Sequence, residues 1–264
     1  MTPAAATFAR IHALWDELAD FDAVRGEEAM QHLLQGLCGL AHASDATWVG
    51  AVRMGDPLPG DPVRGWRPRT VRHLHATSQL DLAVQAQTRT LESGQVDPNI
   101  VRNVSFAGQF RIHRLAELVS PDWFEGDYYR TYYQGMGYHD ALWAGVPINQ
   151  DAESYFGLYR GSGQPPFANA ELDAVLHALR GLRWFLRQQM LGYGLLVATT
   201  PLTPVEHSVL HGLLTGRTEK QIAEDQRQSH GTTHEYVARI YRKYGVNNRA
   251  SLMALWLGHG VPAP

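Results

Sequence analysis

Lysine is absent from the first 200 residues, and cysteine is almost absent from the whole chain of 264 residues. The single cysteine, Cys38, excludes an intrachain disulfide and is typical of a protein from a reducing cytoplasm. Its place in an apolar stripe of helical spacing favours inert packing over redox sensing. No apolar run approaches the roughly 18–20 residues that cross a bilayer, and residues 1–10 lack the pattern of a secretory signal. We therefore expect a cytoplasmic protein.

Charge is small overall and unevenly distributed along the chain. A formal net charge of −3 argues against a general nucleic-acid binder. Residues 1–202 carry 16 basic and 21 acidic side chains, whereas residues 203–264 carry seven and five. Five basic side chains and a single acid, Glu235, lie within residues 227–249. Any contact with nucleic acid is therefore expected in the last quarter of the chain.

The first 196 residues have the pattern of an α+β domain. Apolar residues keep helical spacing in five segments: residues 8–18, 30–38, 79–91, 106–118 and 170–191, the last capped by Asn169. Strand patterns occur at residues 46–54, 70–76, 141–148 and 154–160. The last two strands flank a turn at residues 149–151 and are expected to form a hairpin. Because neighbouring strands usually pair antiparallel, we expect an antiparallel sheet with helices packed on one face.

The last part of the chain carries the signals of four short helices. Four residues stand at positions typical of helix N-caps: Thr203, Thr218, Ser229 and Asn248. Glu206 and Gln221, each three positions after a threonine, complete two capping boxes. Gly216 and Gly245 are suited to the left-handed residue that ends a helix. Four short helices, the second and third joined by a tight turn, describe a helix-turn-helix unit.

These two patterns divide the chain into two predicted domains. Residues 1–196 form an α+β domain with an antiparallel sheet and flanking helices. Residues 197–202, with the sequence VATTPL, form a linker. Residues 203–264 form an all-α, four-helix domain of the helix-turn-helix type.

Four motifs follow one another along the last quarter of the chain. They are Leu202-Thr203-Pro204-x-Glu206, Leu213-Leu214-x-Gly216, Lys220-x-Ile222-Ala223 and Val237-x-x-Ile240-Tyr241-x-Lys243-Tyr244-Gly245-Val246-x-x-Arg249. Together they resemble the C-terminal domain of LuxR/NarL-type transcriptional regulators. The resemblance implies a homodimer that binds a dyad site in double-stranded DNA, with the third helix in the major groove and the fourth often at the dimer contact.

The geometry of helix-turn-helix units assigns the candidate DNA contacts. The third helix presents side chains to base edges, while helix caps, helix N-termini and basic residues bind phosphates. Nine residues are candidates on this basis: Thr218, Lys220, Ser229, Thr232, His234, Glu235, Arg239, Arg242 and Lys243.

Several positions depart from the family pattern. Gln226, Gln228 and Thr233 stand where that pattern is usually apolar. Gly231 lies in the start of the third helix, at a cost of about 1 kcal/mol relative to alanine. Glu235 brings a negative charge close to the expected phosphate face. We therefore predict weak, strongly salt-sensitive DNA binding that depends on dimerisation.

An aromatic-rich segment between residues 123 and 143 is the candidate sensor region. The missing lysine and the missing strand-helix alternation exclude the phosphoacceptor domain of response regulators. The segment resembles autoinducer-binding domains and, more closely, the GAF- or PAS-like sensors that precede some LuxR-type domains. Clustered tryptophan and tyrosine suit a pocket for an amphiphilic small molecule, or they form only a hydrophobic core. The candidate ligand contacts are Trp123, Tyr129, Tyr133, Asp140 and Trp143.

Other constellations give no support for a catalytic or metal site. The pairs His207/His211 and His230/His234 have a spacing that can bind a metal, but no metalloprotease glutamate or cysteine accompanies them. The sequence contains no nucleophile elbow, no Walker loop and no cysteine–histidine pairing. We therefore expect no enzyme activity, no cofactor and no metal.

The patterns together predict a bacterial, ligand-responsive transcriptional regulator, in which a ligand shifts the placement of two helix-turn-helix modules. Two alternatives stay open. One is an interaction protein without DNA binding, such as an anti-activator that pairs with a related regulator. The other is a ligand-independent regulator whose N-terminal domain serves only for dimerisation.

Overall fold

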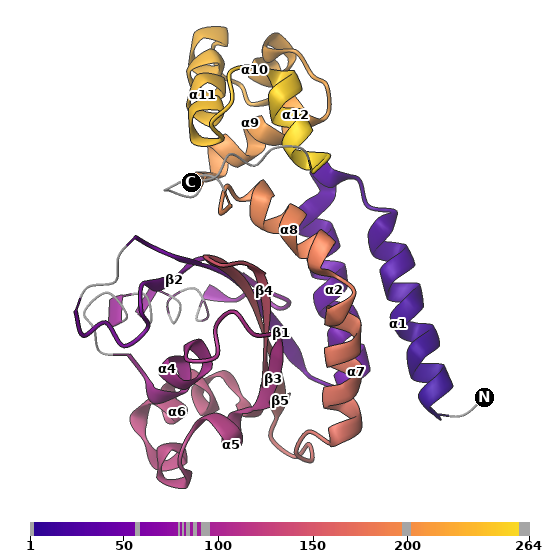
Figure 1. Cartoon of the computed structure of the whole chain (residues 1–264), viewed down its shortest axis with the longest axis vertical. Coiled ribbons are helices and arrows are strands. Elements are labelled where there is room, and N and C mark those ends of the chain that lie inside the picture. Colours follow the sequence, from indigo (N-terminus) through magenta and orange to yellow (C-terminus); the bar gives the residue numbers. More distant parts are fainter. Residues whose placement is uncertain are drawn as a thin grey trace. The chain divides into compact units, whose positions relative to one another are not determined.

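The computed structural model describes residues 3–55, 59–78, 80, 82, 85–86, 89–90, 96–196 and 202–258. Figure 1 shows the order of the helices and strands. The chain divides into two compact units, the first of Met1–Asp20 and Glu27–Trp184, the second of Phe21–Gly26 and Phe185–Pro264. The helix predicted over residues 79–91 and the linker predicted over 197–202 lie largely outside the described residues. That helix and the domain boundaries therefore stay predictions.

The first unit contains a five-stranded antiparallel sheet with the spatial order β2-β1-β5-β4-β3. Its strands are β1 (Asp45–Arg53), β2 (Trp66–His73), β3 (Arg111–Arg114), β4 (Tyr138–Asn149) and β5 (Ala152–Gly161). The predicted hairpin of β4 and β5 is confirmed, with Trp143 opposite Gly157. The antiparallel sheet and its flanking helices confirm the α+β class.

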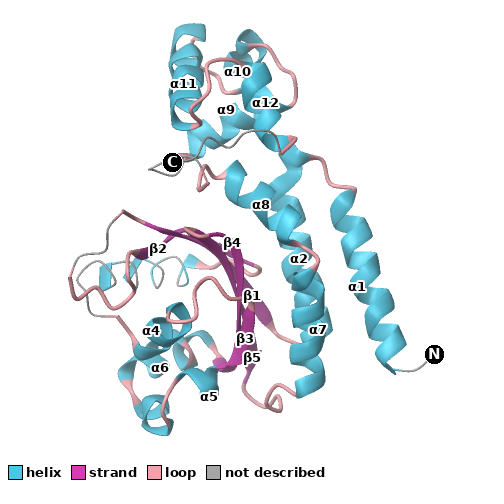
Figure 2. Ribbon diagram, in the orientation of Figure 1, coloured by secondary structure: helices cyan, strands magenta, loops and turns pink. Residues whose placement is uncertain are grey.

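Helices cover both faces of this sheet (Figure 2). One face carries α2 (Gly26–Ala41) and α7 (Asn169–Arg180), with α1 (Pro3–Ala19) packed outside them. The other face carries α4 (Pro98–Val104), α5 (Leu115–Leu118) and α6 (Asp127–Tyr132). The expectation of helices on one face is therefore wrong. The central strand β5 is buried at every position from Ala152 to Arg160, which requires packing on both sides of the sheet. Short 3₁₀ helices occupy Ala23–Arg25, Pro121–Glu125 and Gln134–Met136.

The helix predicted over residues 106–118 is wrong, because a distant segment decides the structure there. Strand β3 and the short helix α5 occupy its second half. Arg111 lies opposite Gly145 in the pairing of β3 with β4. Its guanidinium is 2.5 Å from the carboxylate of Glu153, whose side chain is 0% exposed. This long-range pairing outweighs the local helical spacing.

The helix predicted over residues 170–191 is interrupted, and α7 is followed by a separate helix, α8 (Arg183–Gly192). The indole N–H of Trp15 donates to the carbonyl of Ala178 at 2.8 Å. In a continuous helix that carbonyl would accept from the amide of Leu182, which donates to another carbonyl instead. The contact with α1 therefore ends α7.

The start of α7 also differs from the prediction by one residue. The N-cap is Ala168, and Asn169 is the first residue of the helix. The carboxylate of Glu171 accepts a hydrogen bond from the Ala168 amide at 2.8 Å. Glu171, in the first turn of the helix, therefore satisfies the amide of the N-cap residue Ala168. Asn169, the predicted cap, does not have that role.

The second unit contains the four predicted C-terminal helices: α9 (Pro204–Leu214), α10 (Glu219–Asp225), α11 (His230–Lys243) and α12 (Arg249–Trp256). All four predicted N-caps are confirmed. The side chains of Thr203, Thr218, Ser229 and Asn248 accept hydrogen bonds from the amide three residues on, at 3.3, 3.3, 3.1 and 2.8 Å. Gly216 and Gly245 have φ angles of +78° and +63°, as expected of residues that follow a helix.

One apolar cluster holds these helices together. Its buried members are Leu191, Val209, Leu210, Leu213, Ile222, Val237, Ile240, Tyr244, Leu252 and Leu255. The hydroxyl of Tyr244 donates to the carbonyl of Leu191 at 2.6 Å. This bond fastens the last turn of α8 to α11 within the same unit. In the part of the chain that the structure describes, no helix is both long and apolar enough to cross a membrane.

Candidate ligand cavity and nucleic-acid interface

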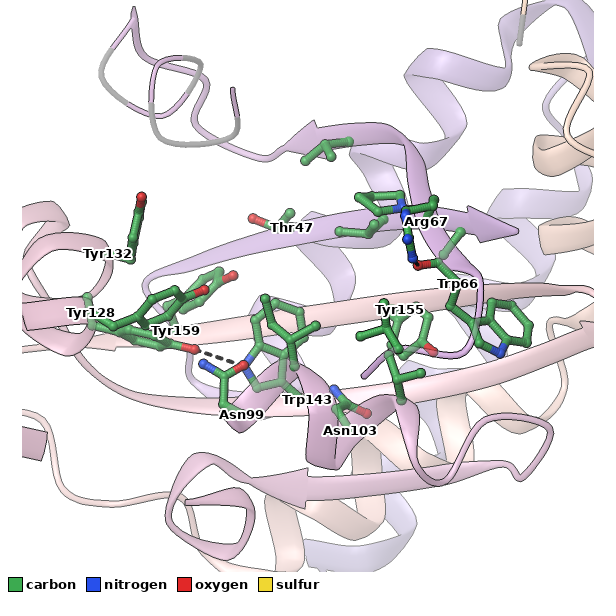
Figure 3. Close-up of a pocket in the computed structure, with 18 of the residues that line it drawn as sticks. Thr47, Trp66, Arg67, Asn99, Asn103, Tyr128, Tyr132, Trp143, Tyr155 and Tyr159 are labelled. Atoms are coloured by element: carbon green, nitrogen blue, oxygen red, sulfur yellow. Dashed lines mark hydrogen bonds between the residues drawn. The ribbon is translucent and has the colours of Figure 1, made fainter. Parts of the chain in front are cut away.

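A cavity of about 190 Å³ lies between one face of the sheet and helices α4 and α6 (Figure 3). Alternate residues of a strand face opposite sides of a sheet. The strand pairings put Thr47, Trp143 and Tyr159 on the cavity side. Seven described aromatic side chains line the cavity: Trp66, Tyr128, Tyr132, Tyr133, Trp143, Tyr155 and Tyr159. These walls suit a ligand with an apolar or aromatic body.

The tyrosine hydroxyls beside the cavity are uncharged. Trp143 Nε1 donates to the hydroxyl of Tyr133 at 3.2 Å. Tyr138 stacks on Tyr159 with ring centroids 4.5 Å apart, and its hydroxyl donates to the carboxylate of Asp45. Burial raises the pKa of both Tyr133 and Tyr159 above the usual value. These hydroxyls therefore stay protonated at neutral pH.

A buried ion pair ties α4 to the sheet beside the cavity. Arg111 Nη1 lies 2.5 Å from Glu153 Oε1, and the two side chains are 6% and 0% exposed. The same guanidinium donates to the main-chain and side-chain oxygens of Asn103 on α4, at 3.0 and 3.3 Å. It also lies over the ring of Tyr155, 5.2 Å from the centroid. A Cβ at Gly145 would meet this guanidinium at 2.5 Å, so β4 needs glycine there.

The polar lining of the cavity carries no uncompensated charge. Asn99 and Asn103 lie one turn apart on α4, and both line the cavity. The oxygen of Asn103 accepts from Arg111, whereas Nδ2 of Asn99 is buried without a hydrogen-bond partner among the described residues. Arg67 pairs with Asp61 at 3.1 Å. His73 also lines the cavity, and its Nδ1 lies 2.8 Å from Thr47 Oγ1. Among the described lining residues there is no aspartate or glutamate, so the cavity suits a neutral ligand better than a cation.

The five predicted ligand contacts fall into three settings. Tyr133 and Trp143 line the cavity. Trp123 and Tyr129 belong to the aromatic cluster packed beside it. Asp140 lies on the opposite face of the sheet, where its carboxylate accepts hydrogen bonds from two backbone amides at 2.8 and 3.3 Å. The structure thus brings two of the five residues into the cavity.

Sequence reasoning missed the lining residues outside the aromatic segment, among them Thr47, Trp66, Asn99, Asn103, Tyr155 and Tyr159. A signal for Tyr155 and Tyr159 was present, because residues separated by an even number along a strand share a face. The two asparagines gave no signal, since the helix that carries them, α4, has no apolar repeat long enough to predict it.

On the candidate nucleic-acid interface, α11 buries one side and exposes the other. Thr233, Val237 and Ile240 are buried in the unit. Eight of the nine predicted DNA contacts are exposed: Thr218, Lys220, Ser229, Thr232, His234, Glu235, Arg239 and Arg242. The ninth, Lys243, is half-buried. The predicted residues therefore share the surface formed by α10, α11 and their caps.

Lys243 is engaged inside the unit. Its Nζ lies 2.7 Å from Glu206 Oε2, and the same carboxylate accepts from the amide of Thr203 at 2.8 Å. Burial alone would raise the pKa of Glu206, but the hydrogen bonds from Lys243 and Thr203 outweigh it and lower that pKa below its usual value. This ion pair joins the cap of α9 to the end of α11, which leaves phosphate contacts to other cations.

Four basic side chains at this surface form no ion pair with any described residue: Lys220, Arg227, Arg239 and Arg242. Arg239 lies over the ring of Tyr236, 4.3 Å from its centroid. By contrast, Arg217 pairs with Asp225, and His234 Nδ1 is 2.9 Å from Glu219. The positive charge open to solvent is thus concentrated on α10, on α11 and on the turn between them.

The unit accommodates the unusual residues of its helix-turn-helix. Gln226 Nε2 donates to Ser208 at 2.5 Å. Thr233 is 0% exposed, and its hydroxyl has no hydrogen-bond partner in the described part of the chain. A Cβ at Gly231 would meet no atom closer than 3.9 Å. None of these residues prevents the four helices from closing around their core.

Comparison with known proteins identifies this unit. A family model described as "Bacterial regulatory proteins, luxR family" matches residues 200–256, the segment that holds α9 to α12. This segment is a LuxR-family helix-turn-helix domain. The expected resemblance is therefore confirmed for the last part of the chain.

Curated proteins with similar sequences are bacterial regulators. The probable HTH-type transcriptional regulator GfsR of Streptomyces halstedii is 34% identical over 58 residues, which are 22% of this chain and 24% of that protein. The response regulator Rre1 of Synechocystis sp. is 30% identical over 99 residues, which are 35% of this chain and 41% of that protein. The chain thus covers about a quarter and about two fifths of these relatives.

Two solved structures are also similar to the chain. The VqsR LBD domain from Pseudomonas aeruginosa has 16% identity and a TM-score of 0.47, over 68% of this chain and 95% of that one. SdiA in complex with octanoyl-rac-glycerol has 12% identity and a TM-score of 0.48, over 100% of this chain and 99% of that one. The assignment of the last part of the chain to the LuxR family therefore rests on the match of residues 200–256 to the family model.

Proposed function

We propose that the chain is a transcriptional regulator that binds a dyad site in double-stranded DNA as a homodimer and responds to a small molecule. The exposed side of α11, within a LuxR-family domain, is the observation that carries this proposal. Thr232, Glu235 and Arg239 follow one another at helical spacing on that side. In a major groove, arginine can contact guanine and glutamate can accept from cytosine. The helix therefore supplies the chemistry of base recognition.

Phosphate binding falls to the cations without an ion pair at the same surface. Lys220, Arg227 and Arg242 are exposed, while Lys243 is held by Glu206. A single module with so few phosphate contacts binds weakly and with strong salt dependence. Two modules in a dimer would engage two half-sites together and so reach useful affinity.

The cavity of the first unit supports a small-molecule input. Its walls are largely aromatic, its described lining contains no aspartate or glutamate, and it lies in the same chain as the LuxR-family domain. A ligand that binds one arrangement of the dimer better than another would shift the population toward the arrangement that fits the two half-sites. Ligand binding would then change DNA affinity.

Fluorescence anisotropy with the full-length protein and the DNA upstream of its own gene tests DNA binding. We expect Arg239→Ala to weaken binding by about 1–3 kcal/mol and to relax the sequence preference at one base pair. Arg242→Ala should weaken binding to all sequences alike and lower the salt slope by about 1. Arg130→Ala, an exposed change on α6, is the matched control and should leave the curves unchanged.

An interaction protein without DNA binding is the second candidate. It is favoured by the exposed acids Glu224, Asp225 and Glu235 around the α10–α11 turn, which oppose phosphate binding. A folded protein that selects no site from the upstream DNA or from a random DNA pool, even at low salt, would support this candidate over ours.

Sedimentation of the full chain tests the homodimer. Met253 is 37% exposed on α12, and the variant Met253→Glu should shift the protein toward monomers.

A further inference from the structure

A buried amide on α4 faces the cavity without a hydrogen-bond partner. We propose that Asn99 is the hydrogen-bond anchor for a neutral carbonyl compound with an aromatic or short alkyl body, an inference that rests on the proposed ligand-binding role of the cavity. Asn99 is 5% exposed, and its Nδ2 is buried with no partner among the described residues. In Figure 3 its side chain extends from α4 toward the tyrosines of the opposite wall. Because an unpaired buried donor is unfavourable, a ligand that brings an acceptor is selected over one that does not.

The position of this amide is fixed from both ends of α4. At its start, the carboxylate of Asp97 caps the helix by accepting from the Asn99 main-chain amide at 2.9 Å, and it also accepts from the indole of Trp123 at 3.0 Å. One turn later, both oxygens of Asn103 accept from Arg111. A donor on a helix held at two points is pre-organised for a ligand.

The charge around the cavity favours a neutral ligand. Arg67 is neutralised by Asp61 at 3.1 Å, and the buried hydroxyls of Tyr133 and Tyr159 stay protonated. An ammonium group would therefore enter without a counter-charge, because the described lining holds no aspartate or glutamate. A carboxylate would meet Arg67, already paired, and the imidazole of His73, whose Nδ1 lies 2.8 Å from Thr47 Oγ1. A carbonyl oxygen needs only the donor that Asn99 offers.

The volume of the cavity suits a small compound. An apolar cavity of about 150 Å³ holds benzene, and this cavity measures about 190 Å³. A benzene ring with a short carbonyl substituent matches that size, and the aromatic walls offer edge and face contacts to its ring. Acetophenone has this shape, and α-methylstyrene replaces its carbonyl oxygen by a methylene group at nearly the same volume.

These two compounds test the anchor directly. Dissociation constants for both are measured with the full-length protein by fluorescence of the tryptophans, two of which, Trp66 and Trp143, line the cavity. We expect the wild type to bind acetophenone about tenfold more tightly than α-methylstyrene. Asn99→Leu, of similar volume, should abolish or reverse that preference. Ile100→Val, a neighbouring lining residue, should change both affinities by the same factor. Because the readout is a ratio within each variant, changes in stability cancel.

Three outcomes distinguish a failure of the Asn99 anchor from a failure of the proposed ligand-binding role of the cavity. A tenfold preference that is lost in Asn99→Leu and kept in Ile100→Val supports Asn99 as the anchor. Equal binding of both compounds to the wild type, or a preference that survives in Asn99→Leu, overturns the anchor and leaves the cavity as a ligand site. Binding of neither compound to the wild type overturns both the anchor and the ligand chemistry assigned to the cavity.

Discussion

The two units of this protein are specified over different distances along the chain. In the LuxR-family domain, each helix begins with a hydrogen bond between residues three positions apart, as where the amide of Glu206 donates to the hydroxyl oxygen of Thr203. In the first unit, decisive contacts join residues that are far apart: Arg111 and Glu153 are separated by 42 positions, and Trp15 and Ala178 by 163. Helices defined by their own caps can be recognised from local patterns. A sheet enclosing a cavity cannot, because its pairings close long loops.

The units also differ in how they treat buried polar groups. Beside the cavity, Arg111 and Glu153 satisfy each other, and Asn99 keeps a free donor that faces the cavity. In the LuxR-family domain, the side chain of Thr233 is 0% exposed and its hydroxyl has no hydrogen-bond partner among the described residues. An unpaired buried polar group therefore has different consequences in the two units. At a cavity it can select a ligand, whereas in a closed core it only lowers stability.

Breaking the ion pair between Arg111 and Glu153 should change the free energy of unfolding more than any other substitution proposed below. Glu153→Met leaves the guanidinium of Arg111 buried without its counter-charge, and arginine cannot lose its proton. We expect the first unit to lose about 3–5 kcal/mol of unfolding free energy, with little change in the LuxR-family domain. Denaturant titration followed by hydrogen exchange of peptides from each unit would measure this. The matched control is Asp151→Asn at the exposed pair with Arg53, where a loss below about 1 kcal/mol is expected. Equal losses in the two variants would refute the special role of the buried pair.

An intermediate effect is expected at the ion pair between Lys243 and Glu206. Lys243→Met leaves the 3% exposed Glu206 without its counter-charge and with hydrogen bonds from Thr203 only, which should cost the LuxR-family domain about 1–3 kcal/mol at pH 7. The pKa of Glu206 is lower in the folded protein than its usual value. Its contribution is therefore present above the unfolded pKa, about 4.3, and is lost as the pH falls through the folded pKa.

The stability difference between wild type and Lys243→Met should consequently shrink in acid. Urea unfolding of the full chain at pH 7 and at about pH 3, with hydrogen exchange of α9 to α12, would measure it. Arg242→Met, one residue away and exposed, is the control and should have little effect at either pH. A difference that is the same at both pH values would show that packing of the lysine stem, and not the ion pair, matters.

The smallest change in stability is expected at Thr233, where a substitution should stabilise the domain instead of destabilising it. Thr233→Val replaces an unpaired buried hydroxyl by a methyl group of similar size, so the LuxR-family domain should gain about 1 kcal/mol. The midpoint of thermal unfolding should rise accordingly. Thr232→Val, at the exposed neighbour, serves as control and should change it little. A lower midpoint for Thr233→Val would mean that the hydroxyl is satisfied in solution, for example by the carbonyl one turn earlier.

Much of the fold could be predicted where the signal is local. The four N-caps were predictable because a cap and the amide it binds are three residues apart, and the β4–β5 hairpin because alternation and a turn motif occur together. The exposure of Thr232, Glu235 and Arg239 followed from helical periodicity alone. In the candidate cavity, Tyr133 and Trp143 were predicted from an aromatic cluster, while Asp140 was placed on the other face by a strand register that composition does not reveal.

The sequence by itself determined the ends of the C-terminal helices, the hairpin and the family of the last domain, since each depends on residues a few positions apart. Only the tertiary structure decided that α7 stops where Trp15 takes the Ala178 carbonyl, and that residues 111–114 form a strand. It also decided that Asn99 and Tyr159 line the same cavity. These outcomes depend on partners far along the chain, and the free energy of such contacts outweighs local propensity without leaving a periodic pattern.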